Sequence, residues 1–245
     1  MIKQGGQWKE VDWTAALEYV ARGLKDVVAQ KGAAAIGALA SEHSTTEELH
    51  LLAKLVRALG SDNIDTRLRH ADFTAGRGAR WLGTSIASLS SLNAALVVGS
   101  FLRKDHPLFA QRLRQAQKHG GQVFAIGSAA DDWALPLAGR VTVQPSQWTR
   151  ALAEVAAAVA EAKGVSAQVA VQASAEAQAA AKSLLNGQAK AVLLGNAAAA
   201  HPQASQLLAL ASFIGEHTGA SVGYLTAAAN TVGAQLAGAL PGAGG

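Results

Sequence analysis

The residues most able to bind a ligand follow a short apolar run near the middle of the chain. Gly99 and Ser100 end this run, and Arg103, Lys104 and His106 come soon after them. Cationic side chains beside the start of a helix are typical of an anion site, because the first backbone N–H groups of a helix are unpaired and carry positive partial charge. This spacing is typical of a phosphate or diphosphate site, but most loops between a strand and a helix bind nothing, so spacing alone favours a connecting loop whose two cations are solvated.

A second group of polar residues lies between residues 61 and 73. It is densely charged, with Asp62, Asp65, Arg67 and Arg69 in close succession. Such a group either forms an ion-pair network that fixes a loop or contributes to a ligand pocket. The run 76–78 (Gly-Arg-Gly) that follows it is predicted to be a flexible basic turn.

The elements around the first group show the clearest secondary-structure pattern in the sequence. Residues 94–98 read Ala-Ala-Leu-Val-Val, the pattern of a strand buried on both faces. Pro107 opens a helix that ends at Gly120-Gly121, and a second strand covers 123–126. Strand, crossover helix and strand form a βαβ unit and hence a parallel sheet, in which ligands bind beyond the carboxyl ends of the strands.

The remaining chain repeats this arrangement. A strand at 191–194 is followed by Gly195-Asn196, by a helix at 202–217 that Pro202 opens after His201, and by a strand at 221–225. The sequence therefore predicts an α/β fold of parallel sheets flanked by helices, with two similar half-domains. We expect these at 1–163 and 164–245, the second smaller, Ala-rich and truncated at its C-terminus.

Two helices are predicted near the N-terminus. The first runs from Asp12, as N-cap, to about Gln30. Ser44-Thr45-Thr46-Glu47 reads as a capping box that begins the second, which Gly60 ends. Between them, the small apolar run 33–40 is predicted to be a buried strand. Residues 85–92 are expected to form a short helix before the central strand.

Composition excludes several classes of protein. The chain has no cysteine, so it can hold neither a disulfide nor a cysteine-bound iron–sulfur cluster. No apolar run is long enough to span a membrane. The net charge of +4 is concentrated between residues 54 and 119, which favours an anionic ligand or an acidic partner. No nucleic-acid signature, catalytic motif or metal-ligand spacing occurs, so we expect no catalytic residue and no metal site.

Several motifs resemble one known family. The run Asp62–Arg69 followed by Asp72-Phe73 resembles the 75 kDa-type subunit of the bacterial respiratory NADH:quinone oxidoreductase, complex I. Gly6–Trp13 looks like the start of that subunit's large domain, Val98–Pro107 like a loop of that domain, and Ala229–Ala234 like its Ala-Asn-x-x-Gly-Ala element. The resemblance covers essentially the whole chain.

The resemblance implies a molybdopterin-oxidoreductase-like domain, related to formate dehydrogenases and nitrate reductases. Active relatives bind a molybdenum or tungsten pterin guanine dinucleotide and carry an Asn-Asn-x-Asp-x-x-x-Arg-x-Cys run. This chain keeps Asn63, Asp65 and Arg69 of that run but has Ala71 where the family has Cys. The resemblance thus implies that molybdopterin is unlikely and that any anion or pterin site is vestigial. The candidate residues for that site are Asn63, Asp65, Arg69, Gly99, Ser100, Arg103, Lys104 and His106.

By the same resemblance, we expect a non-catalytic structural domain of the peripheral arm of complex I. Its partners would be other peripheral-arm subunits and the N-terminal iron–sulfur domain of the same subunit, which would hold the clusters. It would lie on the cytoplasmic side of the bacterial inner membrane, without inserting into the membrane and without binding nucleic acid. Two alternatives are a cofactor-binding half of an active molybdenum oxidoreductase and a nucleotide-binding α/β module without enzymatic role.

Overall fold

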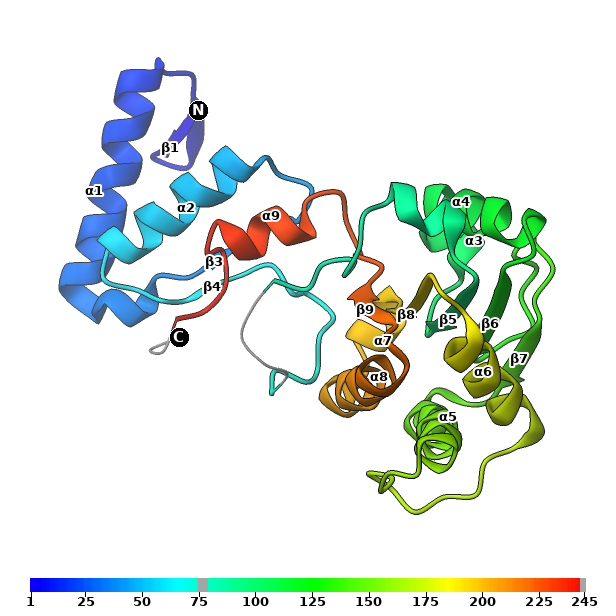
Figure 1. Cartoon of the computed structure of the whole chain (residues 1–245). Helices are drawn as coiled ribbons and strands as arrows, with labels where there is room; N and C mark the ends of the chain where they lie inside the picture. Colours follow the sequence, from blue (N-terminus) through cyan, green and yellow to red (C-terminus); the bar gives the residue numbers. More distant parts are fainter. Residues whose placement is uncertain (75–78, 243–245) are drawn as a thin grey trace. The chain divides into compact units, whose positions relative to one another are not determined.

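The computed structural model describes residues 1–74 and 79–242 and divides the chain into two compact units (Figure 1). One unit comprises Met1–Leu68 together with Ala228–Gly245, and the other comprises Arg69–Ala227. The predicted basic turn at 76–78 lies outside the described residues. The boundary expected between residues 163 and 164 falls inside the second unit, between two helices that pack against each other.

The second unit is built on a five-stranded sheet. Its strands are β5 (Ala94–Val98), β6 (Gln122–Gly127), β7 (Gly139–Thr142), β8 (Lys190–Leu194) and β9 (Ser221–Tyr224). They lie in the order β7-β6-β5-β8-β9, and every neighbouring pair is parallel. The predicted βαβ unit is confirmed, and both repeats contribute strands to this single sheet.

Helices cover both faces of the sheet (Figure 1). The helix α4 (Pro107–Lys118) packs on one face, together with the 3-10 turn at Ala87–Ser91 where a short helix was expected. The other face carries α5 (Trp148–Lys163), α6 (Ala175–Asn186) and α8 (Ala204–Thr218). Ala is the most frequent residue at their buried positions, which lets the helices approach one another closely. Alternate strand residues enter the two cores, as the pleat requires.

The order in which successive strands are added to the sheet reverses at β5. From β5 the chain proceeds outward to β6 and β7, then returns to place β8 on the other side of β5. Short helices follow these two central strands: α3 (Leu102–Asp105) after β5 and α7 (Asn196–Ala199) after β8. In open α/β sheets such a reversal leaves a crevice at the carboxyl ends of the strands, where ligands bind.

The segment before β5 closes the free edge of β9. The backbone N–H of Tyr224 donates to the carbonyl of Trp81 at 2.8 Å. The Asp72 carboxylate, which is buried, accepts hydrogen bonds from the Ser205 N–H (2.8 Å) and hydroxyl (2.5 Å) at the start of α8. Together with bonds from Thr74, these hold the pKa of Asp72 well below its usual range. Asp72 therefore ties this segment to the body of the unit.

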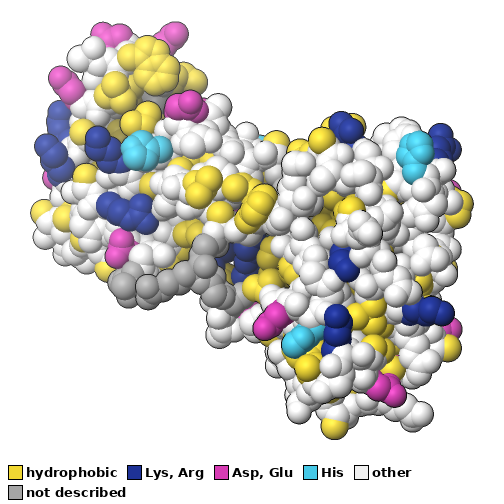
Figure 2. All heavy atoms as spheres, viewed as in Figure 1, with side chains coloured by type: hydrophobic (Ala, Val, Ile, Leu, Met, Phe, Trp, Pro, Cys, Tyr) yellow, Lys and Arg dark blue, Asp and Glu magenta, His cyan; other side chains and the backbone are white. Residues whose placement is uncertain are grey.

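The first unit contains the helices α1 (Trp13–Lys31), α2 (Thr46–Ala58) and α9 (Thr231–Leu236). Two strand pairs accompany them: the hairpin β1 (Ile2–Gln4) with β2 (Gln7–Lys9), and the parallel pair β3 (Ala38–Leu39) with β4 (Ile64–Asp65). The predicted N-cap is confirmed, because the Asp12 carboxylate accepts from the Ala15 N–H at 2.8 Å. Hydrophobic side chains gather over α1 and the hairpin in Figure 2, and Trp13 is 81% exposed.

Two predictions for the first unit were wrong in detail. The strand expected at 33–40 is a 3-10 turn at Ala33–Ala35 followed by the two-residue β3, because a run of Ala and Gly has little β-propensity. The capping box lies one residue later, between Thr45 and Glu48. Both registers satisfy the S/T-x-x-E pattern, so the sequence pattern alone could not distinguish them.

Candidate functional site

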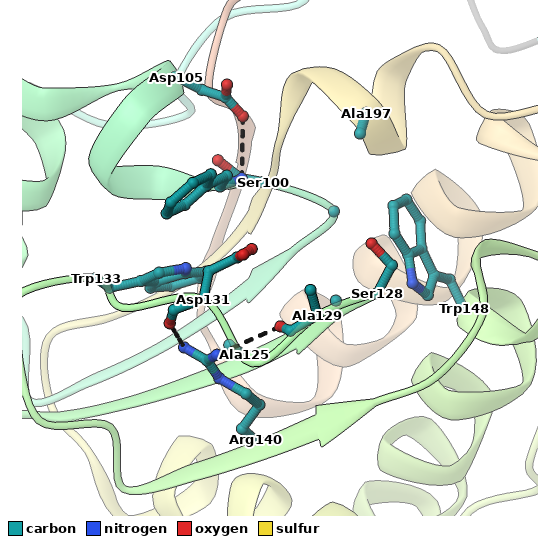
Figure 3. A pocket seen from close by; sticks show the side chains of 13 residues that line it. Ser100, Asp105, Ala125, Ser128, Ala129, Asp131, Trp133, Arg140, Trp148 and Ala197 are labelled. Atoms are coloured by element: carbon teal, nitrogen blue, oxygen red, sulfur yellow. Dashed lines mark hydrogen bonds between the residues drawn. The ribbon is translucent and has the colours of Figure 1, made fainter.

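A hollow of the second unit lies at the carboxyl ends of β5 and β6 (Figure 3). It is a cavity of about 180 Å³. Gly99 and Ser100 line it after β5, Gly127 and Ser128 after β6, and Trp148 from the first turn of α5. Ala197 of α7 also lines it, so the cavity lies at the point where the strand order reverses, between the ends of β5 and β8. This is the location at which the sequence predicted a site.

Gly99 forms the tightest part of the wall. Its φ is +64°, and its carbonyl accepts from the Ala197 N–H at 3.1 Å and the Ala198 N–H at 3.3 Å. A Cβ added at Gly99 would lie 2.8 Å from both the Ala198 nitrogen and Cζ3 of Trp148. The glycine therefore lets α7 and the indole ring pack directly on the end of β5.

Two buried polar atoms of the lining have no hydrogen-bond partner. Among the described residues, four such side-chain atoms occur: Ser100 Oγ, His106 Nε2, Trp148 Nε1 and Tyr224 OH. Ser100 is 8% exposed and Trp148 4% exposed, and both line the cavity. Buried polar atoms are almost always paired with protein or water, so the Ser100 hydroxyl and the Trp148 indole N–H are the atoms of this lining that still need a partner.

The opposite wall is a loop held in place by an arginine. Arg140 of β7 donates to the carbonyl of Asp131 at 2.7 Å and to that of Ala129 at 3.3 Å. Its guanidinium also lies over the Trp133 ring, 5.4 Å from the centroid. The Arg140 N–H groups are thus directed at the loop backbone, while the Asp131 carboxylate points into the cavity (Figure 3).

Only part of the first predicted residue group meets in this cavity. Gly99 and Ser100 line it, whereas Arg103, Lys104 and His106 do not. Arg103 and Lys104 belong to α3, and Arg103 pairs with Asp132 at 2.6 Å on the surface. His106 precedes α4 and is buried against Phe109, with ring centroids 5.9 Å apart. Burial lowers the pKa of His106, and the nearby carboxylate of Asp105 opposes this shift.

The second predicted group makes local contacts. Asn63 donates its side-chain amide to the Ala34 carbonyl at 2.9 Å, within the first unit. Burial raises the pKa of Asp65, but hydrogen bonds from the Arg67 side chain and from the Arg67 and Thr66 N–H groups outweigh it and leave the pKa lowered. Arg69 is exposed at the start of the second unit. Anion binding by any of these candidate residues stays a prediction.

Sequence reasoning missed the residues that give the cavity its chemistry. The pair Gly127-Ser128 repeats the Gly-Ser pattern that follows β5, and this signal could have indicated a second wall. Asp131 lies in the loop after that pair, and its position next to Asp132 does not show which of the two enters the cavity. Trp148 reads as an ordinary core residue at the start of a helix, so no signal marks it.

Comparison with known proteins identifies the class. The family model for molybdopterin oxidoreductases matches residues 1–244, so this chain belongs to the molybdopterin oxidoreductase family. Putative formate dehydrogenases of Staphylococcus aureus, from strains MRSA252 and N315, are each 30% identical over 129 residues. That match covers 50% of this chain but 13% of each relative, so the chain spans a small part of the length of these proteins.

Two solved structures share the fold. A chain of the formyltransferase/hydrolase complex from Methylorubrum extorquens superposes with a TM-score of 0.61 over 92% of this chain and 59% of its own length, at 18% identity. Acetylene hydratase from Pelobacter acetylenicus gives a TM-score of 0.55 over 87% of this chain and 34% of its own length, at 17% identity. At these identities the likeness concerns the fold alone.

The comparisons support the coarser part of the sequence-based expectation. An oxidoreductase-family domain with a parallel sheet flanked by helices is confirmed. The comparisons reach the family but not the 75 kDa-type subunit of complex I in particular. Membership of the family makes a molybdopterin plausible, which is at odds with the expectation that this cofactor is unlikely. No helix among the described residues is long and apolar enough to cross a membrane.

Proposed function

We propose that this chain is a structural, non-catalytic domain of an oxidoreductase complex, namely of the 75 kDa-type subunit in the peripheral arm of an NADH:quinone oxidoreductase. In that role it packs against the iron–sulfur domain and neighbouring subunits on the cytoplasmic side of the membrane. It supports electron transfer from NADH to quinone by the whole complex without itself holding a redox group. The motif resemblance at Asp62–Arg69 and Val98–Pro107 supports the choice of complex.

The observation that carries the non-catalytic part is the chemistry of the cavity beside β5. A pterin guanine dinucleotide contains a diphosphate, which binds best to unpaired N–H donors and free cations. The cavity has two carboxylates in its lining, Asp105 and Asp131. Its arginine, Arg140, is already bonded to two loop carbonyls, and Arg103 is paired with Asp132 outside the cavity.

Size points the same way. The cavity is about 180 Å³, whereas pockets for drug-sized ligands measure roughly 300–1,000 Å³. The cavity is therefore too small to enclose a whole pterin guanine dinucleotide. The sequence also lacks any cysteine, so this chain supplies no thiolate for a molybdenum atom.

The second candidate is a dinucleotide-binding part of an active molybdenum oxidoreductase. The family match favours it, and so do the close approach allowed by Gly99 and the unpaired donors of Ser100 and Trp148. In that case Ser100 and Trp148 would hold the cofactor, which would supply two-electron chemistry at its metal.

A metal count on the native protein separates the two candidates. The endogenous protein is captured from gently solubilised membranes with an antibody to this chain, and iron, molybdenum and tungsten are measured alongside the co-purifying subunits. Iron with many subunits, and neither molybdenum nor tungsten, is expected. Molybdenum or tungsten near one atom per chain, with pterin fluorescence after oxidation, would overturn the proposal, as would recovery of the chain alone.

A further inference from the structure

The carboxylate of Asp131 is the least satisfied charged group of the cavity. Its carbonyl oxygen is held by Arg140, but its side chain makes no hydrogen bond or ion pair with any residue that the structure describes. The residue is half-buried, and Figure 3 shows the carboxylate directed between Trp133 on one side and Ser128 and Trp148 on the other. A carboxylate in this setting attracts a cation or an N–H donor.

The rest of the lining defines the shape of that cation. The Trp133 ring stands on the side of Asp131, and the Trp148 indole stands opposite (Figure 3); Phe101 also lines the cavity. Flat aromatic walls favour planar cations, because a guanidinium both stacks on a ring and donates a fork of N–H groups to a carboxylate. An ammonium ion matches only the charge.

The unpaired Trp148 Nε1 and Ser100 Oγ define a second requirement. The indole N–H can only donate, so it needs an oxygen acceptor on the ligand. The Ser100 hydroxyl can donate to the same acceptor. The cavity volume of about 180 Å³ corresponds to about six water molecules, since each occupies roughly 30 Å³ in the liquid. The ligand is therefore compact.

We propose that this cavity binds a guanidinium group that carries an oxygen acceptor a few bonds away. The Asp131 carboxylate pairs with the guanidinium, and Trp148 and Ser100 donate to the acceptor. The guanidinium belongs either to a free small molecule or to an arginine side chain of a bound peptide, whose carbonyls supply the acceptor. This inference concerns a cation and is independent of the proposed function, which concerns the absence of a diphosphate site.

The test is a titration of the ¹⁵N-labelled chain, followed by the indole Nε1–H signal of Trp148 in two-dimensional NMR spectra. The probes are methylguanidinium, guanidinoacetamide and the blocked peptide acetyl-Gly-Arg-Gly-amide. Methylurea, which is neutral and of similar shape, and inorganic pyrophosphate are the controls. Guanidinoacetamide or the peptide is expected to bind more tightly than methylguanidinium, and whichever of the two binds better identifies the source of the group.

Neighbouring aspartates provide a matched pair of variants. Asp131→Asn is expected to weaken guanidinium binding by about tenfold or more, since hydrogen bonds to charged groups contribute more than neutral ones. Asp132→Asn removes an adjacent carboxylate that pairs with Arg103 outside the cavity, and it should leave binding unchanged. Thermal unfolding of both variants verifies that they fold.

Three results would overturn the inference. One is a Trp148 signal that responds equally to methylurea and to methylguanidinium. Another is Asp131→Asn binding as tightly as the unmodified chain. The third is pyrophosphate displacing the guanidinium probe with higher affinity, which would restore the anion site and would also count against the cavity argument for a non-catalytic domain. Either of the first two results would overturn the guanidinium site but would leave the metal count, and hence the proposed function, unaffected.

Discussion

Substituting Gly99 by Ala tests how closely the end of β5 is packed. Gly99 has φ +64°, and an added Cβ would approach the Ala198 nitrogen and the Trp148 ring to 2.8 Å. The left-handed conformation alone costs an L-residue about 1–2 kcal/mol. Overpacking at a site with backbone on one side costs about a further 1–3 kcal/mol. Gly99→Ala should therefore lower the free energy of unfolding of the second unit by about 2–5 kcal/mol.

Gly164 offers a control with nearly the same backbone conformation. Its φ is +66°, and nothing lies within 4 Å of the position where its Cβ would be. Gly164→Ala should cost only the conformational part, about 1–2 kcal/mol. Both variants gain the same small benefit from a stiffer unfolded chain, so that effect cancels in their difference.

Urea unfolding of the two variants measures the crowding around Gly99 directly. Both glycines lie in the second unit, so the same transition is compared. Gly99→Ala should be the less stable variant by about 1–3 kcal/mol. Equal midpoints and slopes for the two variants would refute the reasoning, because they would mean that α7 and Trp148 do not rest on Gly99.

Three further predictions concern the second unit. Asp72→Asn should destabilise the second unit at neutral pH and make its stability depend less on pH in the acid range. The reason is that a carboxyl whose pKa in the folded state lies below 3.8 stabilises the fold above that pH and loses this contribution on acidification. Urea unfolding midpoints measured across the acid range test this. The pKa of His106 in the folded state lies below 6.5, so the neutral ring stabilises the fold above that pH and this contribution is lost as the pH falls. Between about pH 8 and about pH 5, His106→Phe should therefore lose less stability in urea unfolding than the unmodified chain. Leu207 is fully buried, so Leu207→Ala should cost about 2–5 kcal/mol in urea unfolding, and the same substitution at the partly buried Leu208 should cost less.

The parallel sheet could be predicted because each of its signals is local. Ala94–Val98 is a continuous apolar run with β-branched residues, and Gly120-Gly121 marks the end of the helix that follows. The position of a site at the carboxyl ends of the strands then follows from topology. Gly99 and Ser100 line the cavity for that reason, since they are the first residues beyond the central strand.

The charges of the site could not be predicted because their partners are distant in the sequence. Arg103 and Lys104 follow the strand closely, yet a helical turn carries Arg103 to Asp132, 29 residues on. Asp131 enters the cavity because Arg140, from the next strand, holds its carbonyl oxygen. Proximity in sequence indicated which loop forms the site, but the loop is held by the bonds from Arg140 of β7, whose position next to the loop depends on the pairing of β6 with β7.

The two His-Pro steps show how one sequence pattern can lead to two different environments, and they lead to a last prediction. His106 Nε2 is buried without a partner. His201 has a partner for both nitrogens: Nδ1 accepts from the Gln203 N–H at 3.0 Å, so Nε2 carries the proton and donates to the Pro145 carbonyl at 3.0 Å. Its ring also stacks on Trp148, with centroids 5.7 Å apart.

His201 therefore joins the segment before α5 to the start of α8 and holds the indole that lines the cavity. His201→Phe keeps the stacking but leaves the Gln203 N–H and the Pro145 carbonyl unpaired, so it should cost about 1–3 kcal/mol of stability. It should also broaden or split the Trp148 indole signal, while the same substitution at His106 should leave that signal unchanged. If His201→Phe alters neither the stability nor the Trp148 signal, the cavity wall is held by packing alone and the hydrogen bonds of His201 are dispensable.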